Sequence, residues 1–335
     1  MKNLIFLLCI VILFSFVSSL SAKNNVKIAT IGVVPPHPDM GQEPQEHVKQ
    51  VIQFWVNELA QVLPDQPDLI VLPEACDRPR GLSTEEQFKY FKVRKNQVLD
   101  YFSGVAKENH CYISFGMKRQ VEDGSWRNSC VLLDRDGNTV GIYNKNFPTI
   151  GEMKDGIKAG KEAPVFQCDF GTVACAICFD LNFDELLQRY AEQKPDIILF
   201  PSMYHGGHVQ ADWAYSCRAF FVGSMGQANL PSEIRNPMGK VVASSTNYFH
   251  FTVATINLDY CLVHLGYNWA KLRALKKKYG EVVTIYDPGK IGAVIITSET
   301  DKLSAVEMVR EFKISQLDEY FDESREFRHK PGNME

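Results

Sequence analysis

Three polar residues, each at or near the end of a short apolar run, could together perform nucleophilic catalysis. They are Glu74 after residues 69–73, Lys145 after residues 140–143, and Cys178 after residues 173–177. In open α/β sheets, ligands bind beyond the carboxyl ends of the strands. A carboxylate there could take the thiol proton, the sulfur could attack a carbonyl carbon, and an ammonium group could stabilise the oxygen that becomes negative. Taken singly, the glutamate could start a helix, the lysine could be solvated and the cysteine could be packing, so the spacing alone leaves an enzyme and a structural role both open.

The residues around these positions form three separate motifs. The motifs are Leu72-Pro73-Glu74, the segment 141–152 with Lys145, Phe147-Pro148 and Glu152, and Ile177-Cys178-Phe179-Asp180 followed by Phe183 and Glu185. In order and in residue types they resemble the nitrilase superfamily of carbon–nitrogen hydrolases. The resemblance runs from about residue 26 to residue 259, which is most of the chain.

This resemblance implies a fold and a set of roles. The implied fold is a single-domain α/β protein, a four-layer αββα sandwich that forms a homodimer or a higher homo-oligomer. The implied catalytic residues are Glu74 as general base, Lys145 as stabilising cation and Cys178 as nucleophile. Glu152 matches a second glutamate that lies near the lysine and the substrate in the family. The sequence Cys178-Phe179-Asp180 resembles the Cys-Tyr-Asp of amidase and carbamoyl branches, which favours an amide or ureido substrate over a nitrile.

We therefore expect a hydrolase that cleaves a non-peptide C–N bond of a small linear amide or N-carbamoyl compound through a cysteine thioester. An ordinary thiol, with a pKa of about 8.5, needs a nearby base or positive field to react at neutral pH. The peptide N–H of Phe179 and the ammonium of Lys145 are expected to receive the oxyanion. By resemblance, the loop with Tyr204 and His205 lies over the pocket, and these side chains are candidate substrate contacts.

Two other functions stay open at this point. An N-acyltransferase would pass the thioester to an amine instead of water, and a catalytically silent relative would serve as a binding protein. The presence of Glu74, Lys145 and Cys178 together argues against the silent protein.

The sequence offers little for a metal or a cofactor, and we expect neither. Cys175 and Cys178 match C-x-x-C, but a structural zinc site needs two further ligands. Alternation along a strand would also point the two thiols to opposite faces. His205 and His208 flank two glycines, which indicates a flexible loop near a ligand more than a metal site. No phosphate-binding loop, dinucleotide fingerprint or serine-centred elbow occurs.

The elements that must position these residues alternate between helices and short strands. Helical spacing of apolar residues predicts helices over 46–63, 85–107, 184–193, 212–221 and 306–321. Apolar runs with turn residues between them predict strands near 26–34, 68–72, 112–117, 129–133, 139–143, 173–177, 196–200, 240–243 and 251–257. Two of these runs, 68–73 and 196–201, are fully apolar until a closing proline, as expected for strands buried on both faces. The alternation predicts a layered α/β architecture.

Composition and the N-terminal segment indicate the class of protein and its compartment. The chain has 335 residues, 45% of them hydrophobic, and a net charge of −4, so we expect no nucleic-acid partner. Lys2, the apolar run 4–17 and the small residues 18–22 are typical of a secretory signal. The apolar run is short for a spanning helix, which needs about 20 residues. We expect export to a periplasm or to the medium with no stable membrane span after cleavage; an uncleaved anchor is the alternative.

The sequence thus predicts three regions. They are a signal peptide over 1–22, a carbon–nitrogen hydrolase domain over 23–300, and a C-terminal helical extension with a polar tail over 301–335. Removing Cys9 with the signal leaves eight of nine cysteines, too few for a disulfide scaffold, although one or two bridges stay open.

Overall fold

Two six-stranded sheets form the centre of the molecule. The computed structural model describes residues 24–39 and 41–335, so the predicted signal peptide lies outside the described residues. The first sheet has the order β12 (Phe251–Asn257), β1 (Asn25–Ile31), β2 (Leu69–Val71), β3 (Tyr112–Gln120), β4 (Trp126–Leu133), β5 (Thr139–Asn144). The second has the order β11 (Val241–Ser244), β10 (Glu233–Arg235), β9 (Phe220–Met225), β8 (Ile197–Ser202), β7 (Thr172–Cys175), β6 (Val165–Gln167).

The two sheets pack against each other through a continuous apolar core. Side chains of both sheets, such as Ile28, Val71, Val173 and Leu199, share this core and are fully buried. Hydrogen bonds also join the sheets, because the Thr30 hydroxyl donates to Gly223 O at 2.9 Å. The core therefore lies between the sheets, where water is excluded from both inner faces.

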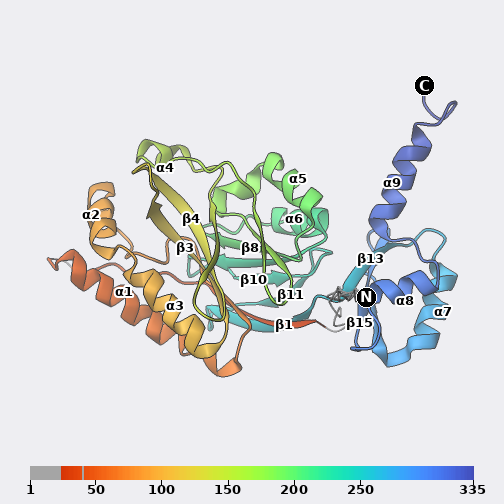
Figure 1. The fold of residues 1–335 in the computed structure, drawn as a ribbon, viewed down its shortest axis with the longest axis horizontal. Coiled ribbons are helices and arrows are strands. Elements are labelled where there is room, and N and C mark those ends of the chain that lie inside the picture. The colour runs from red at the N-terminus through yellow and green to blue at the C-terminus, as the bar shows by residue number, and fades with distance from the viewer. Residues whose placement is uncertain (1–23, 40) are drawn as a thin grey trace, which may run out of the picture.

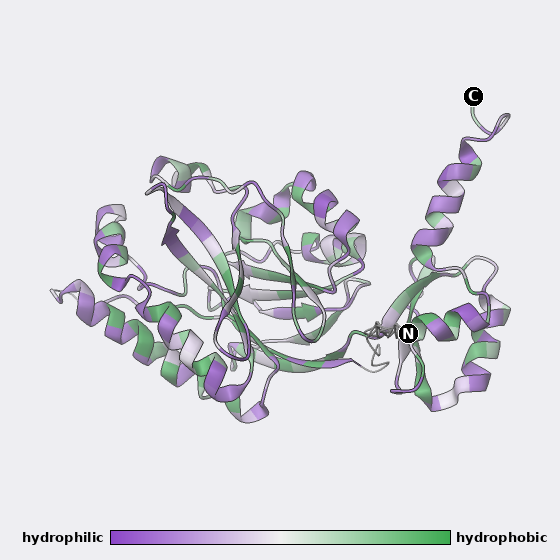
Figure 2. Ribbon diagram, in the orientation of Figure 1, coloured by the Kyte–Doolittle hydropathy of each residue, from purple (hydrophilic) through white to green (hydrophobic). Residues whose placement is uncertain are grey.

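Helices cover the outer faces of both sheets (Figure 1). The helices α1 (Pro44–Leu59), α2 (Thr84–Arg94) and α3 (Gln97–Asn109) lie on the first sheet, and α5 (Asp184–Gln193) and α6 (Val209–Cys217) lie on the second. In Figure 2, the strands between them are largely hydrophobic and the helices alternate hydrophobic and hydrophilic residues. The predicted four-layer αββα sandwich is confirmed.

The central strands of each sheet run parallel, which explains where the polar residues emerge. β1, β2 and β3 are parallel neighbours, and so are β7, β8 and β9. The proline-closed runs of the sequence are β2 and β8, and both strands are fully buried as predicted. Because the sheets face each other, residues that follow β2 and β7 can meet at one edge of the sandwich.

A third sheet and three helices form a C-terminal lobe, which we define as residues 260–328. Its elements are β13 (Tyr260–His264), α7 (Trp269–Tyr279), β14 (Val283–Tyr286), β15 (Ala293–Ser298), α8 (Ala305–Glu311) and α9 (Leu317–Arg328). The lobe has an apolar core of its own, and α9 extends away from the sandwich in Figure 1. Asp318 connects the lobe to the sandwich by ion pairs with Lys194 at 2.7 Å and Arg218 at 3.0 Å. The predicted boundary at residue 300 stays a prediction.

Four predicted helices have different bounds in the structure, and the first, expected over 46–63, runs from Pro44 to Leu59. The expected helix 85–107 is two helices, because Lys95 has φ 43° and interrupts the hydrogen bonding between α2 and α3. The expected helix 212–221 ends at Cys217, and Phe220 begins β9, which pairs with β8. The expected helix 306–321 is α8 and α9, with a break at Lys313, which has φ 50°. None of the described helices is long and apolar enough to cross a membrane.

Candidate active site

Glu74 is held by the chain directly after β2. Its side chain is buried, and Ala75 next to it has φ 59°, which turns the backbone away from the sheet. The backbone of Gly116 in β3 passes so close that a Cβ there would lie 2.8 Å from the Glu74 Cα. The absence of a side chain at residue 116 therefore lets β3 fix the position of Glu74.

Lys145 brings a buried ammonium group to this carboxylate. Its side chain is 1% exposed, and its Nζ lies 3.0 Å from Glu74 Oε1 and 2.8 Å from Glu152 Oε2. Its own backbone N–H donates to Asn128 O at 2.8 Å, which continues the pairing of β5 with β4. The two carboxylates raise the pKa of Lys145, outweighing the effect of burial, so the ammonium stays charged.

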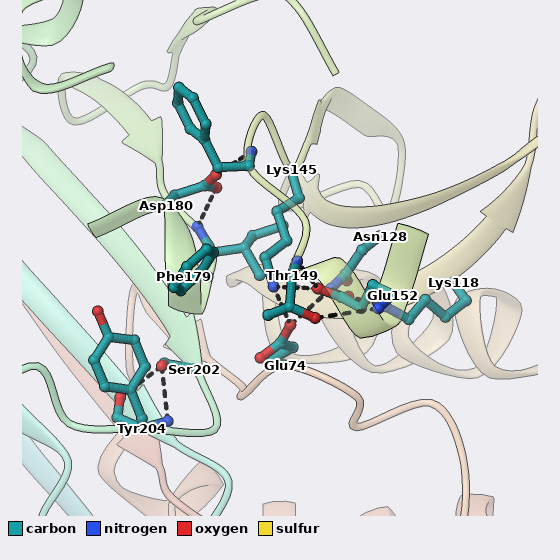
Figure 3. Close-up of polar contacts among 12 residues, drawn as sticks. Glu74, Lys118, Asn128, Lys145, Thr149, Glu152, Phe179, Asp180, Ser202 and Tyr204 are labelled. Carbon is teal, nitrogen blue, oxygen red and sulfur yellow. Dashed lines mark hydrogen bonds and ion pairs between the residues drawn. The ribbon is translucent and has the colours of Figure 1, made fainter. Parts of the chain in front are cut away.

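Glu152 completes a network that Figure 3 shows as one group of side chains pointing toward one another. It lies on α4 (Ile150–Lys154), where it forms a capping box with Thr149. Its Oε1 accepts from Lys118 Nζ at 2.5 Å and from Asn128 Nδ2 at 2.7 Å, while Asn128 also reaches Glu74 at 2.7 Å. The charges of Lys118 and Lys145 hold the pKa of Glu152 well below its ordinary value, although burial acts the other way.

Cys178 begins a 3-10 turn, η2 (Cys178–Asn182), directly beyond β7. Its φ is 49°, a left-handed conformation that is uncommon for a residue with a side chain and is often found at functional sites. Asp180 supports this turn: it accepts from Ile177 N at 2.9 Å, Tyr143 Oη at 2.7 Å and Phe147 N at 2.8 Å. Because Tyr143 and Phe147 flank Lys145, Asp180 ties the cysteine turn to the segment that carries the lysine.

One cavity of about 300 Å³ is lined by Glu74, Lys145, Glu152 and Cys178. Burial raises the pKa of the Cys178 thiol to about 12, and the charge of Glu74 adds to this effect. The charge of Lys145 and hydrogen bonds from Met203 and Ser202 act in the opposite direction. The resting thiol therefore keeps its proton at neutral pH, with a carboxylate and a cation close by.

Comparison with known proteins identifies the family of this chain. Residues 30–261 match the family model described as carbon-nitrogen hydrolase. The chain belongs to this family. A similar curated relative is the omega-amidase NIT2 of Xenopus tropicalis, which is 23% identical over 215 residues, or 57% of this chain and 77% of the relative. The nitrilase homolog 2 of Dictyostelium discoideum is 22% identical over 244 residues, or 65% of this chain and 73% of the relative.

Solved structures show the same fold. An amidase of the nitrilase superfamily from Nesterenkonia AN1 superposes with a TM-score of 0.59 at 14% identity, over 70% of this chain and 91% of that one. Nit3 of Saccharomyces cerevisiae superposes with a TM-score of 0.58 at 16% identity, over 80% of this chain and 97% of that one. The match to the nitrilase-like architecture therefore extends over most of this carbon–nitrogen hydrolase.

None of the remaining predicted site residues of this carbon–nitrogen hydrolase is among the residues that line the cavity. Phe179 is 37% exposed and meets the ring of Phe183 edge-on. Tyr204 accepts from Asn182 through its hydroxyl oxygen at 2.9 Å. Both ring nitrogens of His205 are engaged, because Nδ1 accepts from the backbone of Gly207 at 3.1 Å and Nε2 lies 3.1 Å from Glu233. Contacts of these three side chains with a substrate stay predictions.

Two cysteines of the C-x-x-C pattern have different environments. Cys175 is the last residue of β7 and is completely buried, whereas Cys178 lies beyond the strand and reaches the cavity. A hydrogen bond with the Cys130 thiol of the facing sheet contributes to raising the pKa of Cys175. All eight cysteines in the described part of the chain are free thiols. That part contains no group of three or more histidine, cysteine or acidic side chains arranged to hold a metal ion.

Three residues of the cavity region were not predicted from the sequence. Lys118 and Asn128 lie on the antiparallel pair β3 and β4, and Arg78 follows Glu74 by four residues. Lys118 is buried as deeply as many apolar residues, at 8% exposed. The only sequence signal for Lys118 is its position directly after the apolar run 112–117. A lysine in such a position more often lies exposed at the end of a strand.

Proposed function

We propose that this carbon–nitrogen hydrolase cleaves the C–N bond of a small linear amide or N-carbamoyl compound, with Cys178 as nucleophile, Glu74 as general base and Lys145 as stabilising cation. The observation that carries the proposal is the buried contact between Lys145 and Glu74, at 3.0 Å, in the same cavity as the Cys178 thiol. The curated relatives named omega-amidases support an amide as substrate.

The first half of the reaction forms a thioester. Glu74 accepts the thiol proton as the sulfur attacks the carbonyl carbon, and the carbonyl oxygen becomes negative near Lys145. The C–N bond then breaks as the protonated Glu74 returns the proton to the leaving nitrogen. Ammonia or an amine departs, and the acyl group stays on the sulfur. The raised pKa of Cys178 fits this sequence, since the thiol ionises only as its proton is taken.

The second half consumes water. Glu74 takes a proton from a water molecule that attacks the thioester carbon, and the sulfur leaves and regains a proton. The peptide N–H of Phe179, directly after the nucleophile, is the proposed second donor to the oxyanion together with Lys145. Loss of one such donor typically costs a factor of about 100–1,000 in kcat.

The test is turnover by purified mature protein. Ammonia release is measured across simple amides, N-carbamoyl amino acids and nitriles for the wild type and for Cys178→Ala. We expect the wild type to release ammonia from an amide or a carbamoyl compound, and the substitution to lower kcat by at least about 1,000-fold. Cys168→Ala is the matched control, because Cys168 is a buried thiol whose pKa burial also raises to about 12 and which does not line the cavity. Retained activity in a folded Cys178→Ala protein would remove the proposal.

We further propose that the chain is exported through its N-terminal signal and works as a homo-oligomer. The support is the charged, apolar and small-residue pattern of residues 1–22 and the family resemblance. Cell fractionation with mass measurement of the mature N-terminus tests export. Light scattering on the purified protein tests assembly, and a monomeric mass would contradict it.

A further inference from the structure

A second cavity, of about 380 Å³, is lined by residues of α2, α3, β3, β4 and β5. We name it the cationic cavity, because every charged residue on its lining is basic. These residues are Lys92, Arg94, Lys95 and Arg119. No acidic residue of the described chain belongs to the lining. A hollow with charge of one sign attracts a ligand of the opposite sign.

Three of the four cations have no counter-ion in the protein. Arg94 is committed, since it forms a buried ion pair with Asp77 and donates to Lys118 O at 2.8 Å. Within residues 24–39 and 41–335, the side chains of Lys92, Lys95 and Arg119 form no ion pair and no hydrogen bond. The three side chains are therefore free to bind an anion.

Arg119 is the cation for which this matters most. Its side chain is half-buried, and burial lowers its pKa with no acid acting in the opposite direction. A guanidinium nevertheless stays protonated in proteins. A half-buried charge without a partner is unfavourable, and an anion in the cavity would relieve this cost.

The cationic cavity is separate from the catalytic cavity, although the two are neighbours. Met117 and Arg119 line the first, while Lys118 between them lines the second, as expected because side chains alternate along β3. Phe91 lines both cavities. None of the steps proposed for hydrolysis uses Lys92, Lys95 or Arg119, so the cationic cavity has no role in that reaction.

The turn between α2 and α3 holds Lys95 in an unusual conformation. Its φ is 43°, a region that residues with a side chain seldom occupy and that is often found at ligand sites. Arg94 Nε donates to Lys95 O at 3.1 Å, which supports the turn. The same arginine thus fixes the backbone of a lysine that lines the cavity.

The uncharged part of the lining indicates the body of the ligand. Trp126 is held in place by Phe88 and Phe91, with ring centroids 5.3 and 5.4 Å away. Its indole N–H donates to no atom of the described residues. Met117 and Ile142 add apolar surface. Since one water occupies about 30 Å³ in the liquid, the cavity has room for a ligand the size of about a dozen waters.

We propose that the cationic cavity binds a small phosphate monoester with an aromatic body. The phosphate accepts hydrogen bonds from the guanidinium of Arg119, whose planar fork matches its oxygens, and lies near the ammonium groups of Lys92 and Lys95. The ring contacts Trp126. A phosphate monoester carries about two negative charges at pH 7 and offsets most of the three free positive charges. This site is independent of the proposed hydrolysis.

The experiment is calorimetric titration of the purified mature protein with three ligands at physiological salt. Phenyl phosphate has both the ring and the charge, inorganic phosphate has only the charge, and phenol has only the ring. We expect a Kd below about 1 mM for phenyl phosphate, and affinities at least about 10-fold weaker for the other two.

Variants assign the binding to this cavity. Arg119→Gln should weaken phenyl phosphate by about 10- to 100-fold. Lys92→Gln and Lys95→Gln should each have a smaller effect, because these side chains are exposed. Trp126→Leu should weaken phenyl phosphate and leave inorganic phosphate unchanged. Arg273→Gln is the control, since it removes the same charge from an exposed position on α7, outside the cavity, and should change nothing.

Each other outcome would overturn the proposal. Absence of binding by the folded wild type at about 10 mM phenyl phosphate, far above the expected Kd, would remove it. Equal weakening by Arg119→Gln and Arg273→Gln would show non-specific attraction. Weakening by Arg78→Gln and not by Arg119→Gln would place the anion in the catalytic cavity. Should Arg119→Gln not fold, the double variant Lys92→Gln/Lys95→Gln decides, and unchanged binding in it would contradict the site.

Discussion

Cys178 shares its cavity with a carboxylate and an ammonium group, and these two charges have opposite effects on the pKa of its thiol. Burial and the charge of Glu74 raise the pKa of the thiol to about 12, whereas the charge of Lys145 lowers it. A thiol in this environment is protected from non-specific alkylation and oxidation, because both reactions proceed through the thiolate. Its reactivity toward a substrate then depends on transfer of the proton to Glu74.

Glu74→Gln should separate the effect of Glu74 on the pKa of the thiol from its role as general base. The substitution removes the negative charge that raises the thiol pKa, so the midpoint of Cys178 alkylation against pH should move to lower pH. Amide hydrolysis should fall by about 100-fold or more, because the general base is lost. Iodoacetamide labelling of the Cys178 peptide, followed by mass spectrometry at a series of pH values, measures the midpoint. Lys145→Met is expected to move the midpoint the other way, and a shift in the same direction would contradict this assignment of charges.

Glu152→Gln should destabilise the protein and change its response to acid. The substitution leaves Lys118 without its carboxylate and Lys145 with one in place of two, and breaking buried pairs typically costs about 3–5 kcal/mol. The pKa of Glu152 is lowered in the folded state, so its stabilising effect is complete above the unfolded value of about 4.3 and is lost as the pH falls below it. Urea unfolding at pH 7 and at pH 3 should show a large difference between wild type and variant at pH 7 and a smaller one at pH 3. An equal difference at both would contradict the linkage.

Site residues differ in how far the sequence could predict them. Glu74, Lys145, Glu152 and Cys178 were expected to meet because motifs of a known family surround them, and the structure brings all four to one cavity. Arg78, Lys118 and Asn128 carry no such motif. Their position depends on the register of β3 with β4 and on the turn after β2, and pairing across a sheet is not encoded in local spacing.

At the scale of the elements, the sequence predicted strands better than helix ends. The buried runs β2 and β8 were found because both faces are apolar. The helix breaks at Lys95 and Lys313 were missed because a left-handed residue usually signals itself as glycine or asparagine, and here it is lysine. The end of α6 was misplaced because Phe220 continues an apolar pattern that fits either a helix or a buried strand.

The close contact of β3 with the Glu74 segment can be tested by a pair of glycine substitutions. A Cβ at Gly116 would lie 2.8 Å from the Glu74 Cα and 2.9 Å from Pro73 O, so Gly116→Ala must displace Glu74. We expect a loss of about 1–3 kcal/mol in stability and a fall in kcat. Gly104→Ala is the control, because a Cβ there meets nothing within 4 Å and alanine favours the α3 helix. Thermal unfolding and kcat of both variants check this, and an unchanged kcat in Gly116→Ala would contradict the positioning.

On the scale of the whole molecule, the C-terminal lobe and the sandwich are joined partly through α9. Leu317 is the only described residue of α9 that is buried, and it packs with Leu262 and Ile295 of the lobe sheet. Its neighbour Asp318 carries the ion pairs to Lys194 and Arg218. Leu317 is thus the main apolar anchor of α9, with the partly buried Tyr320 and Phe321 packed beside it.

Leu317→Ala should release α9 while leaving the sandwich intact. Truncating a buried leucine typically costs about 2–5 kcal/mol, and the other apolar side chains that hold this helix, Tyr320 and Phe321, are only partly buried. Hydrogen exchange should therefore become faster in residues 317–328 and stay unchanged in β3 and β8. Phe327→Ala, which alters a side chain 58% exposed on the same helix, should change neither. Faster exchange throughout the sandwich would show that the lobe is part of a single folding unit.

The helix α4 lies on the surface, with Ile150 68% exposed and Met153 48% exposed, yet it carries Glu152, one of the charged side chains of the site. One carboxylate oxygen of Glu152 accepts both from the backbone of Thr149, at 3.0 Å, and from Lys145, at 2.8 Å. Fraying of this five-residue helix therefore removes one of the two carboxylates that hold the Lys145 ammonium. On warming to a temperature below unfolding, kcat should therefore fall while the circular dichroism spectrum is still that of the folded protein. Cooling should restore kcat.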